Sequence, residues 1–117
     1  MSQYNIGSKA FVAGEDLEAY RRVKLSAGSG SQVEYADAGE EFIGITAAKA
    51  AQGEHVTVDL KTRGRTFKMV ALDAIRVGGD FYGADAGKIS AVVNGSIQGK
   101  VLEASSADLE VVEGLIV

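Results

Sequence analysis

Apolar and polar residues alternate with a period of two along much of the chain, which is the pattern of strands with one buried face. In residues 54–61, Val56, Val58 and Leu60 alternate with polar side chains, and residues 66–72 repeat the pattern with Phe67 and Met69. Shorter or less regular runs predict further strands at residues 9–13, 22–25, 33–35, 42–46, 88–93, 97–103 and 109–112. The helix-forming run at 47–52 is too short to hold a helix unaided.

Glycine turns separate these runs, and the chain has 15 glycines and no proline. Asn94-Gly95 predicts a hairpin, because both central residues of such a turn need positive φ. Arg63-Gly64-Arg65 is expected to join the two best strands, and Gly28-Ser29-Gly30 two others. Strands that end in a glycine turn roughly every ten residues predict an all-β barrel or sandwich.

The predicted fold class is therefore all-β: a small single-domain β-barrel or β-sandwich with glycine-rich turns and at most one or two short helical turns. We expect residues 1–8 to form an N-terminal arm and residues 9–117 to form the single all-β domain. A chain of 117 residues is long enough to bury a core without disulfides or metals.

Composition narrows the chemistry that the chain can perform. The absence of cysteine excludes disulfides, thiolate nucleophiles and cysteine-ligated metals. A net charge of −4 is unfavourable for binding phosphates, so we expect no nucleic-acid partner. No run approaches the ~20 apolar residues of a membrane-spanning helix, and the first residues do not resemble a signal peptide. We therefore expect a protein made in the cytoplasm that has no membrane partner.

Candidate catalytic groups are few. His55, the single histidine, shares the polar face of its predicted strand with Thr57, so we expect it to be solvated rather than to bind a metal. No nucleophile elbow surrounds any serine. The paired acids Glu15-Asp16 and Glu40-Glu41 point to opposite faces of an extended chain and are expected to be solubility charges that flank turns. The sequence thus predicts that the protein is not an enzyme and has no catalytic residue, cofactor or metal site.

Two groups of basic residues are candidates for contacts with other molecules. One is formed by Arg21, Arg22 and Lys24. The other surrounds the predicted turn at Gly64, where it either protects a sheet edge by its charge or docks a protein. Its members are Lys61, Arg63, Arg65 and Lys68.

Both ends of the chain add candidate contacts. Leu115, Ile116 and Val117 would promote aggregation in solvent, so we expect them to pair in a sheet or to pack against another subunit. The N-terminal arm carries Tyr4 and Ile6 and is expected either to fray or to become ordered on a partner.

The order of the glycine-containing motifs resembles that of the small head decoration proteins of tailed bacteriophages, also called capsid cement or stabilisation proteins. The resemblance extends over nearly the whole chain, from about residue 7 to residue 117. The motifs that carry it are, in order, Ala13-Gly14-Glu15, Ala38-Gly39-Glu40-Glu41-Phe42-Ile43-Gly44-Ile45, Ala50-Ala51-Gln52-Gly53-Glu54-His55-Val56-Thr57-Val58, Val77-Gly78-Gly79-Asp80-Phe81 with Ala86-Gly87-Lys88-Ile89, and Ile97-Gln98-Gly99-Lys100-Val101-Leu102-Glu103-Ala104.

The resemblance implies a small all-β fold without catalytic activity. It implies a homotrimer that sits at threefold or quasi-threefold positions on the outer surface of an expanded capsid, after synthesis in the bacterial host cytoplasm. The expected partners are the major capsid protein and further copies of the chain. Under this hypothesis the protein is a virion structural protein that clamps neighbouring capsid subunits and stabilises the shell.

A carrier or ligand-binding β-barrel is the alternative hypothesis, since glycine-punctuated strands suit that fold too. A lipoyl or biotinyl carrier would present a lysine at a hairpin tip with flanking acidic residues or methionine. Lys49, Lys61, Lys88 and Lys100 lack that pattern. A third hypothesis, a hydrolase, would have to rely on His55.

Overall fold

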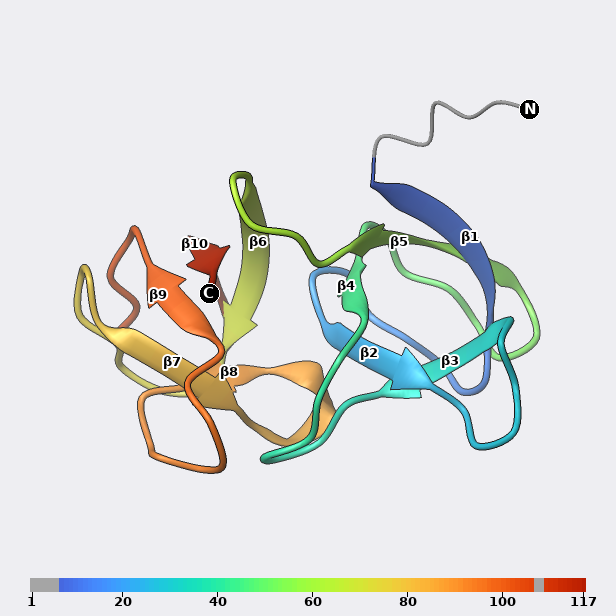
Figure 1. Ribbon diagram of the computed structural model, residues 1–117, viewed down its shortest axis with the longest axis horizontal. Coiled ribbons are helices and arrows are strands. Elements are labelled where there is room, and N and C mark those ends of the chain that lie inside the picture. The colour runs from blue at the N-terminus through green and yellow to red at the C-terminus, as the bar shows by residue number, and fades with distance from the viewer. Residues whose placement is uncertain (1–6, 107–108) are drawn as a thin grey trace.

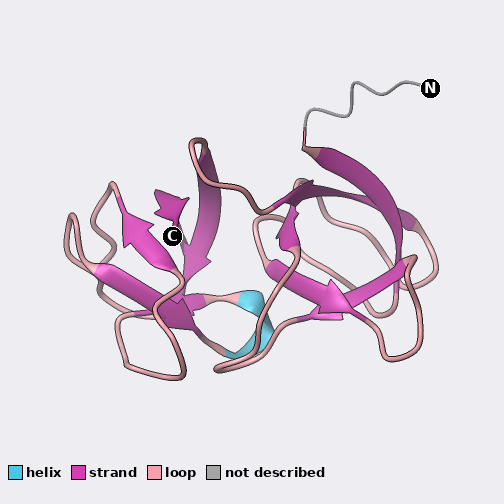
Figure 2. Ribbon diagram, in the orientation of Figure 1, coloured by secondary structure: helices cyan, strands magenta, loops and turns pink. Residues whose placement is uncertain are grey.

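The computed structural model describes residues 7–106 and 109–117, and strands dominate it (Figures 1 and 2). A single helical turn, η1, lies between β7 and β8. The predicted all-β fold is confirmed. The elements are β1 (Ser8–Ala13), β2 (Arg22–Leu25), β3 (Gln32–Tyr35), β4 (Gly44–Thr46), β5 (His55–Leu60), β6 (Thr66–Ala71), β7 (Asp80–Gly83), η1 (Asp85–Gly87), β8 (Ile89–Ser90), β9 (Gly99–Val101) and β10 (Glu110–Ile116).

The strands form two small closed barrels that lie side by side (Figure 1). The first barrel, residues 8–60, has the strand order β1-β3-β2-β4-β5, and the second barrel, residues 66–117, has the order β10-β6-β8-β7-β9. Closure leaves no free sheet edge in either barrel, so that each short strand pairs on both sides.

Apolar side chains that alternate along the strands fill both interiors. The first barrel encloses a cluster that includes Phe11, Leu17, Val23, Val33 and Val58. The cluster of the second barrel includes Met69, Phe81, Ile89, Val101 and Val112, and it extends into the first half through Ala36, Phe42 and Ile45. The two barrels therefore share part of one hydrophobic core.

The second barrel repeats the topology of the first strand for strand. The parallel pair β1–β3 has its counterpart in β6–β8, and the antiparallel pair β1–β5 in β6–β10. The register is also kept: Ala13 pairs with Val33, and Ala71 pairs with Ile89 at the corresponding place. The chain is thus an internal repeat in which β1 to β5 correspond to β6 to β10.

Isolated bridges between loops follow the same correspondence. Leu17 pairs with Ala50 in the first barrel, and Ile75 pairs with Ser105 in the second. In each bridge the two residues exchange both backbone hydrogen bonds, at 2.8 and 2.9 Å in the first barrel and at 3.2 and 2.9 Å in the second. The repeat therefore includes the loops that close the barrel ends.

The repeat also accounts for two non-glycine residues with positive φ. Tyr20 has a φ of 65° at the position where the second barrel has Gly78, whose φ is 75°. Leu109 has a φ of 70° at the position where the first barrel has Gly53, whose φ is 88°. Since left-handed backbone is unfavourable for bulky side chains, the shared topology imposes these conformations.

Two predicted hairpins are wrong. The Arg63-Gly64-Arg65 turn joins β5 to β6, but these strands belong to different barrels, so residues 61–65 form the linker between barrels (Figure 1). The Asn94-Gly95 turn does not join two paired strands either, because β8 and β9 both pair with β7. Of the two turn residues, Gly95 alone has positive φ.

Other sequence predictions agree with the pairing. The Gly28-Ser29-Gly30 turn does join two antiparallel strands, β2 and β3. The strands β1, β5 and β6 lie where the alternation predicts them. Strand β7 was missed because it is short and is flanked by glycine, and the runs at 88–93 and 97–103 contain much shorter strands than predicted.

Arg22, on β2, connects the two barrels from a fully buried position. The five N–H groups of its guanidinium lie within hydrogen-bond distance of six uncharged oxygens, and three of these oxygens share the two hydrogens of Nη2. In the first half the acceptors are the carbonyl oxygens of Ala36 (2.9 Å), Asp37 (3.4 Å) and Glu40 (3.3 Å). In the second half they are the carbonyl oxygens of Ala84 (2.6 Å) and Lys88 (3.1 Å) and Oε1 of Gln98 (3.3 Å).

Burial lowers the pKa of Arg22 from its usual value to about 10, because the charged form loses its hydration. The negative charges of Asp37, Glu40 and Asp85 oppose this effect. The hydrogen bonds of the guanidinium offset the cost of its desolvation, and the acceptors come together only when both barrels are assembled.

We expect Arg22→Met to lower the free energy of unfolding by about 3 kcal/mol, because the carbonyl groups of both barrels lose their donor. Denaturant unfolding followed by circular dichroism measures this change. Arg63→Met, at an exposed linker position, is the matched control and should change stability by less than about 0.5 kcal/mol. Equal stability of the two variants would contradict the role given to Arg22.

Gly44 and Gly99 occupy corresponding positions, opposite Val23 and Phe81 respectively. A Cβ at Gly44 would overlap the carbonyl oxygen of Asp59, and one at Gly99 would overlap that of Leu115. We expect Gly44→Ala and Gly99→Ala each to lower the free energy of unfolding by about 2 kcal/mol or more. Thermal or denaturant denaturation measures this change.

Gly30→Ala is the control for these two glycine variants, because a Cβ there meets no atom within 4 Å. It should leave stability unchanged or raise it slightly. If Gly99→Ala unfolded at the same midpoint as the wild type, the close strand packing in the second barrel would not be required for stability.

Candidate interaction surface

Exposed large apolar side chains gather on the second barrel. Among the described residues, Leu25 is the one that belongs to the first barrel. The others are Leu72, Val77, Val92, Val93, Ile97, Leu102, Leu109, Val111 and Val117. Because the two barrels have one topology, this difference lies in side-chain chemistry and marks the second barrel as the candidate interaction surface.

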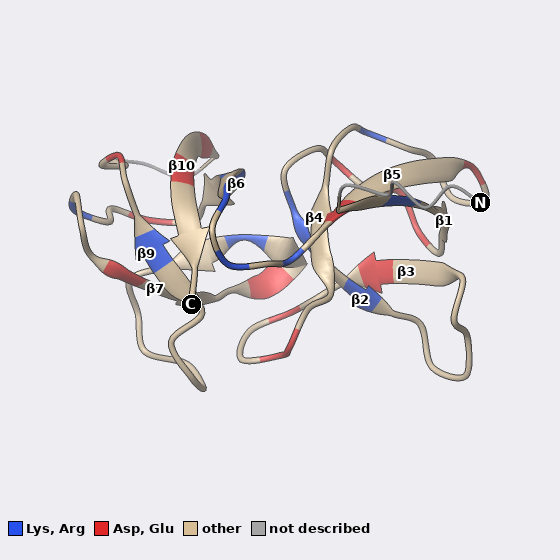
Figure 3. Ribbon diagram, turned by 45° about the horizontal axis from the view of Figure 1, so that its top comes forward, with Lys and Arg blue, Asp and Glu red and all other residues tan. Residues whose placement is uncertain are grey.

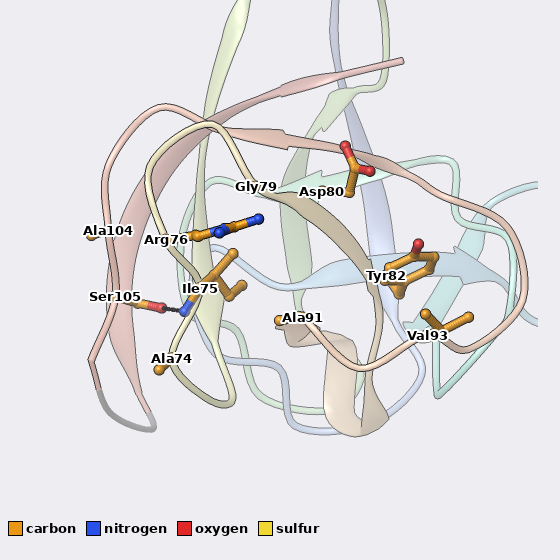
Figure 4. Close-up of a pocket in the computed structure, with 10 residues that line it drawn as sticks. All are labelled: Ala74, Ile75, Arg76, Gly79, Asp80, Tyr82, Ala91, Val93, Ala104 and Ser105. Atoms are coloured by element: carbon orange, nitrogen blue, oxygen red, sulfur yellow. Dashed lines mark hydrogen bonds between the residues drawn. The ribbon is translucent and has the colours of Figure 1, made fainter.

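A cavity of about 630 Å³ opens on the second barrel beside this apolar surface (Figure 4). It lies against the loop that joins β6 to β7, and the buried Ile75 is part of its wall. Tyr82 and Val93 line it from β7 and from the loop that follows β8. Its size falls within the range of roughly 300–1,000 Å³ that is usual for ligand pockets.

Charged groups at this cavity are only partly paired. The Asp80 carboxylate accepts a hydrogen bond of 2.6 Å from the Lys100 ammonium, which neutralises it. Arg76 also lines the cavity, and its exposed guanidinium forms no hydrogen bond or ion pair with the described residues. The Ser105 hydroxyl is occupied, since it donates to the carbonyl oxygen of Asp73 (2.7 Å). The cavity therefore combines apolar walls with one unpaired cation.

The predicted basic candidates lie on the linker and at the start of β6 (Figure 3). Lys61 pairs with Glu41 at 3.2 Å, and the weaker contact of Arg65 with Asp59 measures 3.8 Å. Lys68 lies 6.0 Å from the ring centre of Tyr20.

A second hollow, of about 250 Å³, lies between the barrels, and Arg65 and Lys68 both line it. Arg63 is exposed on the linker, and its side chain forms no contact of these kinds with the described residues. The four basic residues therefore face different surroundings: Arg65 and Lys68 line the inter-barrel hollow, Lys61 pairs with Glu41, and Arg63 is exposed on the linker.

The C-terminal candidates are part of the second barrel. Leu115 pairs with Thr66 on one side and with Lys100 on the other. Ile116 belongs to the shared core, whereas Val117 is 55% exposed. The C-terminal segment thus pairs in a sheet, which is one of the two arrangements that the sequence predicts for it. Tyr4 and Ile6 lie outside the described residues.

The acidic pairs have a structural role that sequence reasoning missed. Glu40 accepts a hydrogen bond from the backbone N–H of Asp37 (2.8 Å), and Glu15 accepts one from that of Tyr35 (3.1 Å). Asp16 accepts one from the N–H of Gln52 (2.9 Å). These carboxylates therefore fix turns and strand ends, in addition to keeping the surface polar.

Glu40 also accepts a hydrogen bond of 2.7 Å from Lys24. This bond, together with the one from the Asp37 backbone, lowers the pKa of Glu40 below its usual 4.5. The same pair raises the pKa of Lys24. The turn at residues 37–40 is thus tied to β2, which carries Arg22.

Side chains that could ligate a metal ion do not cluster among residues 7–106 and 109–117. His55 is exposed on β5, and these residues contain no group of three or more histidine or acidic side chains that would hold a metal ion. The described part of the chain has no helix that is long and apolar enough to cross a membrane.

Comparisons with known proteins place the fold. No protein-family model matches the chain, and neither does any curated protein. A solved structure does match: the head fiber gp8.5 N base in bacteriophage phi29, with a TM-score of 0.77. The two proteins share a fold. The likeness covers 94% of this chain and 92% of that one, at 17% sequence identity.

The lowered pKa of Glu40 predicts a pH effect. Its ionised form is stabilised in the folded state, so its contribution is present above pH 4.5 and is lost as the pH falls through the lower folded pKa. Glu40→Gln should therefore weaken the loss of stability on acidification below about pH 4.5. Thermal midpoints measured between neutral and acidic pH test this.

Glu41→Gln is the control for this variant, since Glu41 directly follows this turn and its side chain is 82% exposed in its pair with Lys61. It should retain the acid sensitivity of the wild type. If Glu40→Gln and the wild type lose the same stability on acidification, the Lys24–Glu40 pair does not act as described.

Proposed function

We propose that the protein is a non-enzymatic structural component of a phage virion. It binds the outer surface of an expanded capsid as a homotrimer at threefold or quasi-threefold positions, and it stabilises the shell by clamping neighbouring major capsid subunits. The observation that carries the proposal is the shared fold with a phage head fiber base over 94% of this chain and 92% of that one.

The distribution of apolar residues supports an attachment role for the second barrel. Its exposed valines, leucines and isoleucine would be covered in a protein contact, and burying each such side chain contributes roughly 1.5–3 kcal/mol. Both barrels are closed, which fixes the strands that carry the apolar loops and limits the entropy that these strands lose on binding. Threefold symmetry would multiply a modest contact into a strong attachment.

Candidate contacts to the capsid or to neighbouring copies are drawn from both ends of the chain and from the linker. Val117 and Arg63 are the described members of this set best placed for direct contact, because both are exposed and, unlike the exposed Lys61 and Lys68, Arg63 has no side-chain partner among the described residues. Ile116 would act indirectly, by holding β10 in the core. The full set is Tyr4, Ile6, Lys61, Arg63, Arg65, Lys68, Leu115, Ile116 and Val117.

Co-sedimentation with expanded capsids that lack decoration tests the proposal. We expect saturable binding at a fixed ratio to the capsid subunit, and little binding to unexpanded shells. Sedimentation equilibrium of the bound form after release should give three times the chain mass of 12.2 kDa. Absence of binding to expanded shells would contradict the virion role and favour a ligand-binding barrel.

Variants of the loop between β8 and β9 test which surface attaches. Val92→Asp combined with Ile97→Asp places charges on two exposed apolar positions of the second barrel. We expect capsid affinity to fall at least about tenfold, since ~1.4 kcal/mol of lost contact suffices. Ala48→Asp, at an exposed loop position of the first barrel, should bind as the wild type does. If the double variant and Ala48→Asp lost the same capsid affinity, the attachment surface would lie outside the loop between β8 and β9.

A further inference from the structure

The internal repeat places Ala91 of the second barrel where the first barrel has Tyr35. The backbone N–H of Tyr35 donates to the Glu15 carboxylate at 3.1 Å, and that of Ala91 donates to the Asp73 carboxylate at 3.0 Å. The pairing of β2 with β3 and of β7 with β8 gives the same correspondence. The two barrels thus share the carboxylate contact at this position but carry very different side chains there, and Tyr35 ends strand β3 whereas Ala91 directly follows β8.

In the first barrel, the side chain of Tyr35 fills the space beside this position. Its ring packs against the hydrophobic cluster of that barrel. The phenol oxygen accepts a hydrogen bond from the backbone N–H of Glu18 at 2.9 Å. The guanidinium of Arg21 covers the ring, 5.7 Å from its centre. Ring, hydroxyl and cation together close the end of the barrel.

In the second barrel, all three parts of this arrangement are missing. Ala91 replaces the tyrosine, and Gly79 replaces Arg21. The cavity of about 630 Å³ lies at this place, lined by Ala91, Gly79 and Arg76. Arg76 corresponds to Glu18, and its backbone N–H donates no hydrogen bond to any described residue. The donor that binds the phenol oxygen of Tyr35 in the first barrel is therefore unused in the second.

The remaining walls of the cavity suit an aromatic ring. Ile75 is buried and apolar, and it corresponds to Leu17 of the first-barrel core. Tyr82 lies across the cavity from Arg76, with Ala91 drawn between them (Figure 4). The Arg76 guanidinium is free to cover a bound ring as Arg21 covers Tyr35. Because Lys100 neutralises Asp80, no unpaired carboxylate repels an aromatic face here.

We propose that the cavity of the second barrel binds a tyrosine side chain presented by a protein partner. The ring takes the place that Tyr35 has in the first barrel, and the phenol oxygen accepts the hydrogen bond of the Arg76 N–H. Tyrosine is favoured over phenylalanine because the unused donor remains unsatisfied beneath a ring without a hydroxyl. The inference does not depend on the capsid role, since its test uses a free phenol.

Titration of the ¹⁵N-labelled full-length protein with p-cresol, the side-chain analogue of tyrosine, tests the proposal. We expect a saturable shift of the Arg76 amide resonance at millimolar p-cresol. Toluene, which lacks the hydroxyl, should bind about fivefold more weakly, the loss expected for one neutral hydrogen bond. Sodium acetate should not saturate the site, because a carboxylate alone leaves the apolar walls uncovered.

Two reciprocal variants use the repeat as its own control. Ala91→Tyr supplies the missing side chain, so the p-cresol response should vanish and the Arg76 amide resonance should already lie near its bound position. Tyr35→Ala opens the first barrel, so the Glu18 amide should gain a response to p-cresol. If Tyr35→Ala does not fold, Ala91→Tyr alone decides the test.

Four results would overturn the proposal. The first is the absence of any saturable response to p-cresol at the Arg76 amide. The second is equal affinity for toluene and p-cresol, which would show a purely apolar site. The third is tighter binding of acetate than of p-cresol, which would show a carboxylate site on the Arg76 guanidinium. The fourth is an unchanged p-cresol response in Ala91→Tyr, which would place the binding site outside this cavity.

Discussion

The arrangement of the two barrels depends on one buried cation. Arg22 leaves the wall of the first barrel and donates to carbonyl groups of both halves, so its hydrogen bonds exist only while the halves are joined. Desolvation is costly enough to lower its pKa to about 10, and the acceptors around it are uncharged oxygens. Removal of such a group leaves the surrounding carbonyl oxygens without a donor, and its planar set of N–H groups fits only one arrangement of these oxygens. We infer that it sets the orientation of the barrels, while Phe42 and Ile45 supply the apolar contact between them.

One topology carries two different surfaces. The first barrel is closed by Tyr35 and Arg21, which fill its end with a ring and a cation. At the corresponding positions the second barrel has Ala91 and Gly79, and it also bears most of the exposed apolar side chains. A duplicated scaffold can divide its roles in this way, because the backbone of each copy is fixed by the same strand pairing whatever its surface presents. The first copy closes its own end with Tyr35 and Arg21, and the second copy exposes most of the large apolar side chains.

Much of the fold could be predicted from the sequence, but little of the site could. The alternation in β5 and β6 identifies these strands, because burial on one face of a strand leaves a local signal. Strand pairing is not local, so the turns at Gly64 and Gly95 were mistaken for hairpins. The repeat was missed because it conserves burial rather than residue type, as when Phe11 is matched by Met69. Arg22 was grouped with surface basic residues, since nothing in its neighbours shows that it is buried. The cavity becomes visible only when the two copies are compared.

Cryo-electron microscopy of expanded capsids saturated with the protein tests the central claim most directly, because it reports attachment, symmetry and orientation together. The account predicts threefold density on the outer surface of the shell, with the second barrel against the capsid subunits and the loop between β8 and β9 at the contact. Density in which the first barrel faces the capsid and the apolar side chains of the second barrel stay in solvent would contradict it, as would shells with no bound protein.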